Sequence, residues 1–234
     1  MFLYNIIMNS PSTEYNKLEK FITMGNVSSF LKGELIATSY KGYDTILLIK
    51  SGLVKRYLIT AEGKNSVQSI YGPGQIFPLT PVFKALFDYS LYEGPETLFY
   101  EAMNDVEVYG AKIADLRVKC DEDPLYYRDL LKVSGERLAS NIQKIENISL
   151  HATYNRVAHQ LHYFAREFGV STSGGTKIDI PLKHQDIAEI LSITRETVSR
   201  DISHLKNEGL ILVSDSHEVT IPDMKKLETT AYEV

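Results

Sequence analysis

The spacing of hydrophobic residues changes its period along the chain. Residues 14–24 carry apolar side chains at helical spacing. From residue 30 to about 116 the pattern becomes a series of short alternating or apolar runs separated by glycine, such as LKGELIAT and TILLIKSGLVKRYLIT. Repeated short runs of this kind predict an antiparallel β-sandwich or barrel. Helical spacing returns from residue 124, which predicts a long helix to about residue 150 and another at 153–168.

Two more helical patterns, at residues 184–191 and 195–206, are separated by a tight turn. Thr194 is a good N-cap for the second helix, because its hydroxyl can accept a hydrogen bond from an N–H of the first turn. Gly209 tolerates the left-handed conformation that follows a helix end. Apolar residues at steps of three and four are expected to form the buried faces of the two helices. They are Ile187, Ile190, Leu191, Val198, Ile202 and Leu205.

The segments around these two helices predict a small sheet. Residues 171–176, with the sequence STSGGT, indicate a flexible loop, and residues 177–180 a short strand. Apolar runs at 211–213 and 218–221 are expected to pair as a β-hairpin. Two helices, a tight turn and a closing hairpin together predict a winged helix-turn-helix.

The outward face of the second helix carries residue types suited to base recognition. Arginine can donate a bidentate pair to guanine, and glutamate can accept from cytosine N4. We expect the base-contacting residues to be Arg195, Glu196, Ser199 and Arg200. At the helix starts, four side chains are expected to hold phosphate oxygens: His184, Gln185, Thr194 and Thr197. The alternative is a solvated helix face with Arg/Glu pairs, which the flanking elements disfavour.

The stretch QDIAEILSITRETVSRDISHLKNEGLI closely resembles the DNA-binding motif of the Crp/Fnr family of bacterial transcription regulators. The resemblance extends more weakly over nearly the whole chain, and one departure is Ser192, where the family usually has glycine. The resemblance to this family implies an α+β fold. The parts are an N-terminal antiparallel β-roll (cupin-like, similar to cyclic-nucleotide-binding domains) at 1–120, a dimerisation helix at 121–150 and a winged helix-turn-helix at 151–234.

The same resemblance implies a homodimer on a palindromic DNA operator, with RNA polymerase as an expected partner. Ser199 matches the Fnr-like pattern, so the half-site is expected to be nearer TTGAT than TGTGA. The long helix supports a dimer through a heptad repeat, which indicates a parallel coiled-coil seam. Its six positions are Leu131, Ser134, Leu138, Asn141, Ile145 and Ile148. The alternative is a single helix lying on its own β-roll.

Aromatic residues are concentrated in and around residues 78–98. They could line a pocket for an apolar or planar effector, although filling of the β-roll core is the favoured interpretation. The residues are Phe77, Phe83, Phe87, Tyr89, Tyr92, Phe99 and Tyr100.

Cyclic AMP is not expected to be the effector. Family members that bind it carry a Gly-Glu-Leu segment and an Arg-Ser pair, whose arginine holds the cyclic phosphate. This chain instead has Pro78, Leu79 and Thr80 for the first, and no arginine lies between Arg56 and Arg117. A buried phosphate without a cationic or amide cradle would carry a large desolvation penalty.

The composition disfavours several other classes of sensor protein and enzyme. The 234 residues include one cysteine and six histidines, and none of the histidines lies in residues 1–150. An iron–sulfur sensor, a haem sensor and a cupin-like metalloenzyme are therefore disfavoured, and no cofactor or metal is expected. No run approaches the roughly 20 apolar residues of a membrane span, and a reducing cytoplasm fits the single cysteine.

The charge balance supports a second hypothesis. The chain has a net charge of −5, and residues 151–234 contain nine basic and twelve acidic residues. DNA-binding domains usually carry a basic patch. The alternative function is therefore an effector-binding module whose winged helix contacts proteins rather than DNA.

Overall fold

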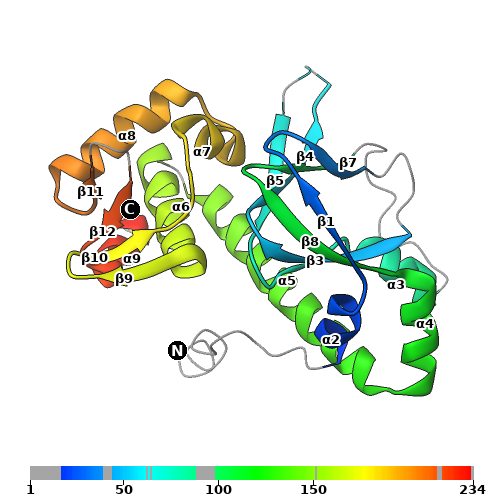
Figure 1. The fold of residues 1–234 in the computed structure, drawn as a ribbon. Helices are drawn as coiled ribbons and strands as arrows, with labels where there is room; N and C mark the ends of the chain where they lie inside the picture. Colours follow the sequence, from blue (N-terminus) through cyan, green and yellow to red (C-terminus); the bar gives the residue numbers. More distant parts are fainter. Residues whose placement is uncertain are drawn as a thin grey trace. The chain divides into compact units, whose positions relative to one another are not determined.

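The computed structural model describes residues 17–38, 44–61, 63, 65–87, 98–150, 152–214 and 218–232. The chain divides into two compact units, one within Met1–Arg56 and Ile70–Arg137 and the other within Tyr57–Ser69 and Leu138–Val234 (Figure 1). The long helix α5, Leu125–Ser149, begins in the first unit and continues into the second. The three-part division expected from the sequence stays a prediction.

Antiparallel strands form the N-terminal β-roll, as predicted. One sheet has the order β1-β8-β3-β6, and its strands are Asn26–Phe30, Val106–Lys112, Thr45–Ser51 and Ile76–Phe77. The other has the order β2-β7-β4-β5, and its strands are Leu35–Thr38, Leu98–Ala102, Val54–Ile59 and Asn65–Tyr71. The apolar residues on the inner faces of β3 and β8 are buried and supply much of the core.

Three short helices accompany the β-roll: α2 at Leu18–Thr23, α3 at Thr80–Phe87 and α4 at Ile113–Glu122. The helix expected at residues 14–24 is confirmed from Leu18 to Thr23, and residues 14–16 lie outside the described part. Leu18 and Ile22 are fully buried in one apolar cluster with Leu130 and Val133 of α5.

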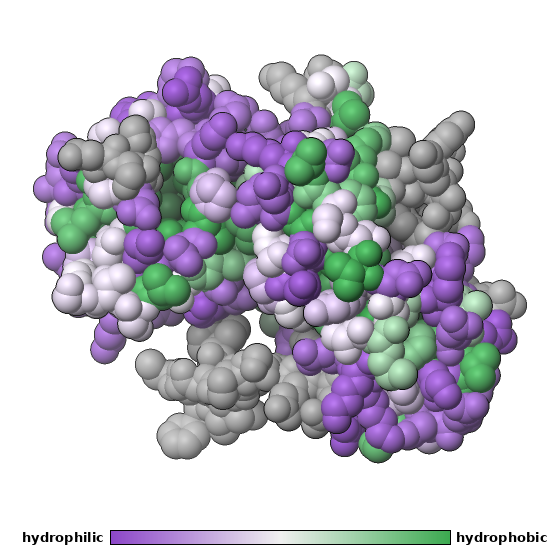
Figure 2. Space-filling view, viewed as in Figure 1, coloured by the Kyte–Doolittle hydropathy of each residue, from purple (hydrophilic) through white to green (hydrophobic). Residues whose placement is uncertain are grey.

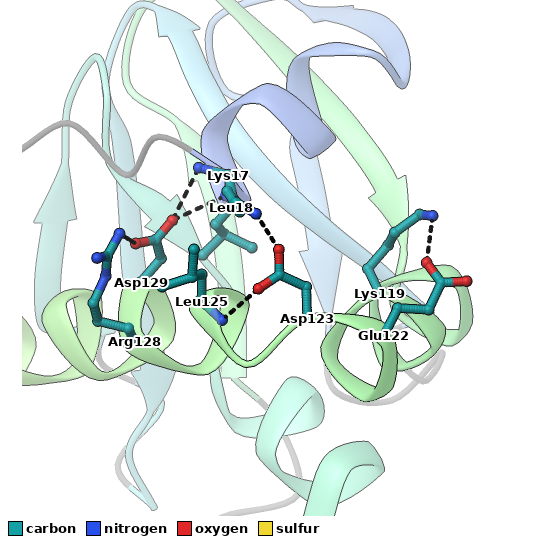
Figure 3. Close-up of polar contacts among 8 residues, drawn as sticks. All are labelled: Lys17, Leu18, Lys119, Glu122, Asp123, Leu125, Arg128 and Asp129. Atoms are coloured by element: carbon teal, nitrogen blue, oxygen red, sulfur yellow. Dashed lines mark hydrogen bonds and ion pairs between the residues drawn. The ribbon is translucent and has the colours of Figure 1, made fainter.

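A buried carboxylate of α5 anchors the start of α2 (Figure 3). Asp129 is fully buried, and its Oδ2 accepts hydrogen bonds from the backbone N–H groups of Lys17 at 3.0 Å and Leu18 at 3.2 Å. These N–H groups have no partner within a helix, and a negative charge there also complements the helix dipole. The Lys17 ammonium forms an ion pair with Asp123. The start of α5 therefore holds the N-terminal helix by electrostatics as well as by packing.

The second unit contains the helices α6, α7, α8 and α9 and one small sheet. The helices are Thr153–Phe168, His184–Leu191, Arg195–Asn207 and Met224–Tyr232. The sheet has the order β11-β12-β10-β9, and its strands are Leu212–Val213, Val219–Ile221, Gly175–Ile178 and Gly169–Thr172. The helix boundaries expected at 153–168 and 184–191 are confirmed, as are the two wing strands.

Two details of this unit correct the expectations from the sequence. The STSGGT segment is not a loop, because β9 and β10 pair through it and leave only residues 173 and 174 as the turn. Gly175 at φ +123 and the Thr172 hydroxyl, which donates to the Gly175 carbonyl, stabilise that hairpin. The strand expected at 177–180 accordingly lies at Gly175–Ile178. The wing tip at residues 215–217 is outside the described part.

Helix α9 was not predicted from the sequence. Its residues Leu227 and Ala231 are fully buried, and the Asn155 side chain of α6 donates to the Thr230 carbonyl at 3.1 Å. The partly polar sequence MKKLETTAY gives this helix only two strongly buried positions, which is a weak periodic signal. Within the described residues, no helix has both the length and the apolar character needed to cross a bilayer.

Candidate nucleic-acid interface

Helix α7 supports the interface and is fixed at its start by a side-chain hydrogen bond. The Asp186 carboxylate accepts from the backbone N–H of Lys183 at 2.8 Å, which closes the first turn. Ile187, Ala188 and Leu191 are buried, so α7 is held by its apolar face. The pattern of apolar residues at steps of three and four therefore determined this helix correctly.

The turn between α7 and α8 contains a backbone conformation that favours glycine. Ser192 adopts φ 53° and ψ 46°, the left-handed region. The next backbone N–H, that of Ile193, then bonds to the Ala188 carbonyl at 3.1 Å. Serine at this point carries local strain that glycine would not. The tight turn at Ser192 directly precedes the start of α8.

Helix α8 begins with the predicted N-cap. The Thr194 Oγ1 accepts from the backbone N–H of Thr197 at 3.2 Å, and the two threonine hydroxyls lie 3.0 Å apart. One hydroxyl donates to the other, so one hydroxyl hydrogen of the pair is left for an outside acceptor. A phosphate oxygen at a helix N-terminus is such an acceptor.

The four residues predicted to contact bases all lie exposed on α8. The side chain of Arg200 is 69% exposed and is therefore accessible to a base. Ser203, which the sequence analysis did not include, continues the same face and donates its hydroxyl to the Ser199 carbonyl at 2.8 Å. The four residues are Arg195, Glu196, Ser199 and Arg200. The outer surface of α8 is correspondingly hydrophilic (Figure 2).

The opposite face of α8 is apolar and buried. Val198 and Leu205 are fully buried and Ile202 is 5% exposed, as the sequence predicted. The Arg156 guanidinium of α6 donates to the Leu191 carbonyl at the end of α7. A helix held along one whole side in this way presents its polar side in a fixed orientation.

The remaining predicted phosphate contacts lie at the start of α7. Gln185 is exposed, and its amide donates to the Glu189 side chain at 3.1 Å. His184 is half-buried and begins the helix. Both residues are on the first turn of α7, while Thr194 and Thr197 are on the first turn of α8. Their roles toward phosphate stay predictions.

Helix α5 carries an exposed apolar stripe along the predicted heptad positions. Leu131 is 70% exposed, Leu138 62%, Ile145 65% and Ile148 63%. Ile142, at 47%, belongs to the same side and was missed by the sequence analysis. Of the two polar heptad residues, Asn141 is exposed, and Ser134 is half-buried with its hydroxyl donating to the Leu130 carbonyl at 2.6 Å.

The predicted aromatic pocket residues that the structure describes are divided mainly between the β-roll core and helix α3. Phe77 and Tyr100 are buried and stacked at 5.0 Å between ring centroids, with Tyr71 against both, in the β-roll core. Phe83 and Phe87 stack on each other along α3, where Phe87 is 50% exposed. Phe99 is half-buried, and Tyr89 and Tyr92 lie outside the described residues.

Comparison with known proteins finds a known domain family in the C-terminal part of the chain. Residues 155–230 match the Crp-like helix-turn-helix domain. A CRP-like cAMP-activated global transcriptional regulator of Mycobacterium tuberculosis is 24% identical over 202 residues, which span 86% of each chain. The matched domain and these relatives support a Crp/Fnr family regulator. Members of this family are transcription regulators rather than enzymes.

Solved structures show the same fold over most of the chain. A CooA mutant from Carboxydothermus hydrogenoformans has a TM-score of 0.72 and 21% identity, covering 95% of this chain and 96% of its own. FixK2 from Bradyrhizobium japonicum has a TM-score of 0.71 and 21% identity, covering 89% and 98%. The predicted α+β fold is therefore confirmed, and the domain match with the relatives supports the predicted Crp/Fnr regulator.

Proposed function

We propose that this Crp/Fnr protein binds a palindromic operator as a homodimer through residues 195–206 and is not controlled by cyclic AMP. The observation that carries the proposal is the exposed polar face of α8, with Arg195, Glu196, Ser199 and Arg200 opposite a fully packed apolar side. Rigid presentation of arginine and glutamate is what major-groove recognition of guanine and cytosine requires.

The homodimer is supported by the apolar stripe of α5. Exposed leucine and isoleucine residues at heptad spacing are unfavourable in water, and pairing with a second copy of the helix would bury them. A two-fold dimer also suits a helix-turn-helix, because two recognition helices about 34–36 Å apart fit successive major grooves.

Replacement of one stripe residue tests the dimer. Leu138→Glu would place a charge from each copy in the proposed seam, so the protein should sediment as a monomer and bind the operator far more weakly. The control is Lys132→Glu, at an exposed position of α5 next to the stripe. Equal dimer content in both variants would contradict the proposed seam.

Independence from cyclic AMP is supported by the positions of the basic residues in the β-roll. No arginine lies between Arg56 and Arg117, and the half-buried Lys55 is already paired with Glu101 at 2.9 Å. The Mycobacterium tuberculosis relative is named as cAMP-activated, so we expect the two proteins to differ in their response to cyclic AMP. An apolar or planar effector near Phe83 and Phe87 stays compatible with the proposal.

The decisive experiment titrates the purified protein against a palindromic TTGAT-type duplex and a scrambled duplex, without ligand and then with cyclic AMP. We expect specific binding that cyclic AMP does not change. A requirement for cyclic AMP would overturn the proposed independence. Equal binding to both duplexes would contradict this operator.

The acidic composition of the C-terminal part favours a second candidate. Residues 151–234 contain twelve acidic and nine basic residues, which is unusual for a DNA-binding domain. In that case the winged helix would contact a protein. A salt series separates the candidates, because DNA affinity should fall steeply as counterion release is suppressed. No measurable affinity for any duplex at low salt would favour the protein-binding module.

A further inference from the structure

We infer that Asp201 is a positioning residue that holds the Arg200 guanidinium in the orientation for base contact. The inference rests on the proposed function, since it names the residue through which Arg200 would be oriented. Asp201 was not singled out by its sequence position, because an acidic residue on a DNA-binding helix gives no recognisable signal on its own.

The pair spans the boundary between the exposed and packed sides of α8. The Arg200 Nε donates to the Asp201 Oδ1 at 3.2 Å. The side chain of Arg200 is 69% exposed, whereas that of Asp201 is 6% exposed. The carboxylate is thus buried, and the guanidinium bonded to it extends into solvent.

This contact leaves the right donors for a base. Arginine has five N–H donors in a rigid plane, and the hydrogen bond to Asp201 uses only that of Nε. The two terminal nitrogens stay available, and they are the donors of a bidentate contact to guanine O6 and N7. A carboxylate on Nε also restricts the plane of the guanidinium, which reduces the entropy lost on binding.

Two features of Asp201 argue against a role in stability or in general DNA affinity. Its second oxygen, Oδ2, is buried and has no hydrogen-bond partner among the described residues, and such an atom is unfavourable in a folded protein. A negative charge beside a DNA-binding face also repels phosphates. Both effects make an aspartate at this position unfavourable, whereas orientation of Arg200 would explain its presence.

The test is a double-mutant cycle in the full-length protein. Affinities are measured for the operator, for duplexes with each base pair changed in turn, and for a scrambled duplex. We expect Asp201→Ala to lower discrimination roughly tenfold, at the same base pair that Arg200→Ala affects. Affinity for the scrambled duplex should stay equal or rise, because a negative charge is removed. In the Arg200→Ala background, Asp201→Ala should have no further effect.

Two further variants separate orientation from charge and folding. Asp201→Asn keeps an oxygen that can accept from Nε, so it should recover part of the discrimination. Glu208→Gln removes the same charge from the end of the same helix, and it should leave the ratio of operator to scrambled affinity unchanged. The melting temperature of Asp201→Ala should be equal to or above that of the wild type.

The outcomes distinguish the inference from the proposed function. Unchanged discrimination in Asp201→Ala together with a loss in Arg200→Ala would overturn the positioning role alone. An effect of Asp201→Ala that persists without Arg200, or a lowered melting temperature, would also overturn it, since Asp201 would then act through the helix itself. Unchanged discrimination in Arg200→Ala would contradict base contact by Arg200.

Discussion

The β-roll and the winged helix-turn-helix are built from different kinds of interaction. In the β-roll, the aromatic core joins Tyr71, Phe77 and Tyr100, which come from three strands separated by up to 29 positions in sequence. In the winged helix-turn-helix, the turn and cap that position α8 involve only residues 188–197. The aromatic core therefore depends on contacts between residues distant in sequence, whereas the turn and cap at the start of α8 depend on local hydrogen bonds.

This difference explains which region shows its chemistry in the sequence. Local caps and turns have residue preferences, so they can be recognised in a short stretch. Aromatic residues in strands fit a core or a ligand pocket equally well, and only their neighbours in space decide between them. Changes in the β-roll should therefore have larger effects on stability than changes in the turn and cap.

The largest effect is expected from Phe77→Ala. Phe77 is completely buried, and truncation of such a phenylalanine costs about 3–5 kcal/mol through lost burial and a cavity. Amide hydrogen exchange of the β-roll strands should show the loss, while α8 keeps its protection. The matched control is Phe87→Ala, because Phe87 is 50% exposed. Similar losses in both variants would contradict the distinction between core and surface aromatics.

Acidification should destabilise the second unit. Burial, with the neighbouring charges of His162 and Arg166, lowers the pKa of His159 to about 4. The unfolded chain, with its histidine pKa near 6.5, therefore binds the proton first. Stability is complete above about pH 6.5 and falls by about 1–3 kcal/mol as the pH approaches 4.

Denaturant unfolding at several pH values measures this dependence. His159→Phe should flatten the slope between pH 6.5 and 4 while the contribution of His162, whose pKa is also lowered by burial, is retained. The Tyr232 hydroxyl lies 3.1 Å from the His159 Nε2 and would lose this contact. About half of Tyr232 is exposed, so water can replace the imidazole. An unchanged slope would contradict the assignment to His159.

A smaller effect is expected from the N-cap of α8. Thr194→Ala removes the acceptor for the Thr197 N–H, which costs about 1 kcal/mol. Thr194→Ser keeps the hydroxyl and should stay close to the wild type. Thermal unfolding of the three proteins makes the comparison. If alanine and serine were equivalent, the cap would contribute nothing to the helix.

The smallest expected effect is a gain in stability. Ser192→Gly removes the strain of the left-handed backbone at φ 53°, partly offset by the greater freedom of glycine in the unfolded chain, for a net stabilisation of about 0.5 kcal/mol. Ser203→Gly is the matched control in the interior of α8, where glycine should cost about 0.5–1 kcal/mol. A loss of stability in both variants would show that no strain is stored at Ser192.

The sequence predicted most elements of the winged helix-turn-helix, and its limits lie at particular residues. The predictions of the N-cap, the C-terminal glycine and the buried stripe of α8 were correct, because caps and helical periodicity are local. These residues are Thr194, Gly209, Val198, Ile202 and Leu205. Helix α9 was missed because only Leu227 and Ala231 are strongly buried in it. The sequence at 171–176 predicts a loop where the structure has a hairpin, since its serines, threonines and glycines also suit unpaired chain.

The sequence by itself determined the family, the position of the two DNA-binding helices and the residue types on their outer face, because these depend on local spacing and chemistry. Only the tertiary structure decided which side of α5 is exposed, where each aromatic residue lies, and that Asp201 holds Arg200 from the packed side of α8. These facts depend on burial, and burial is set by residues that are distant in sequence and adjacent in space.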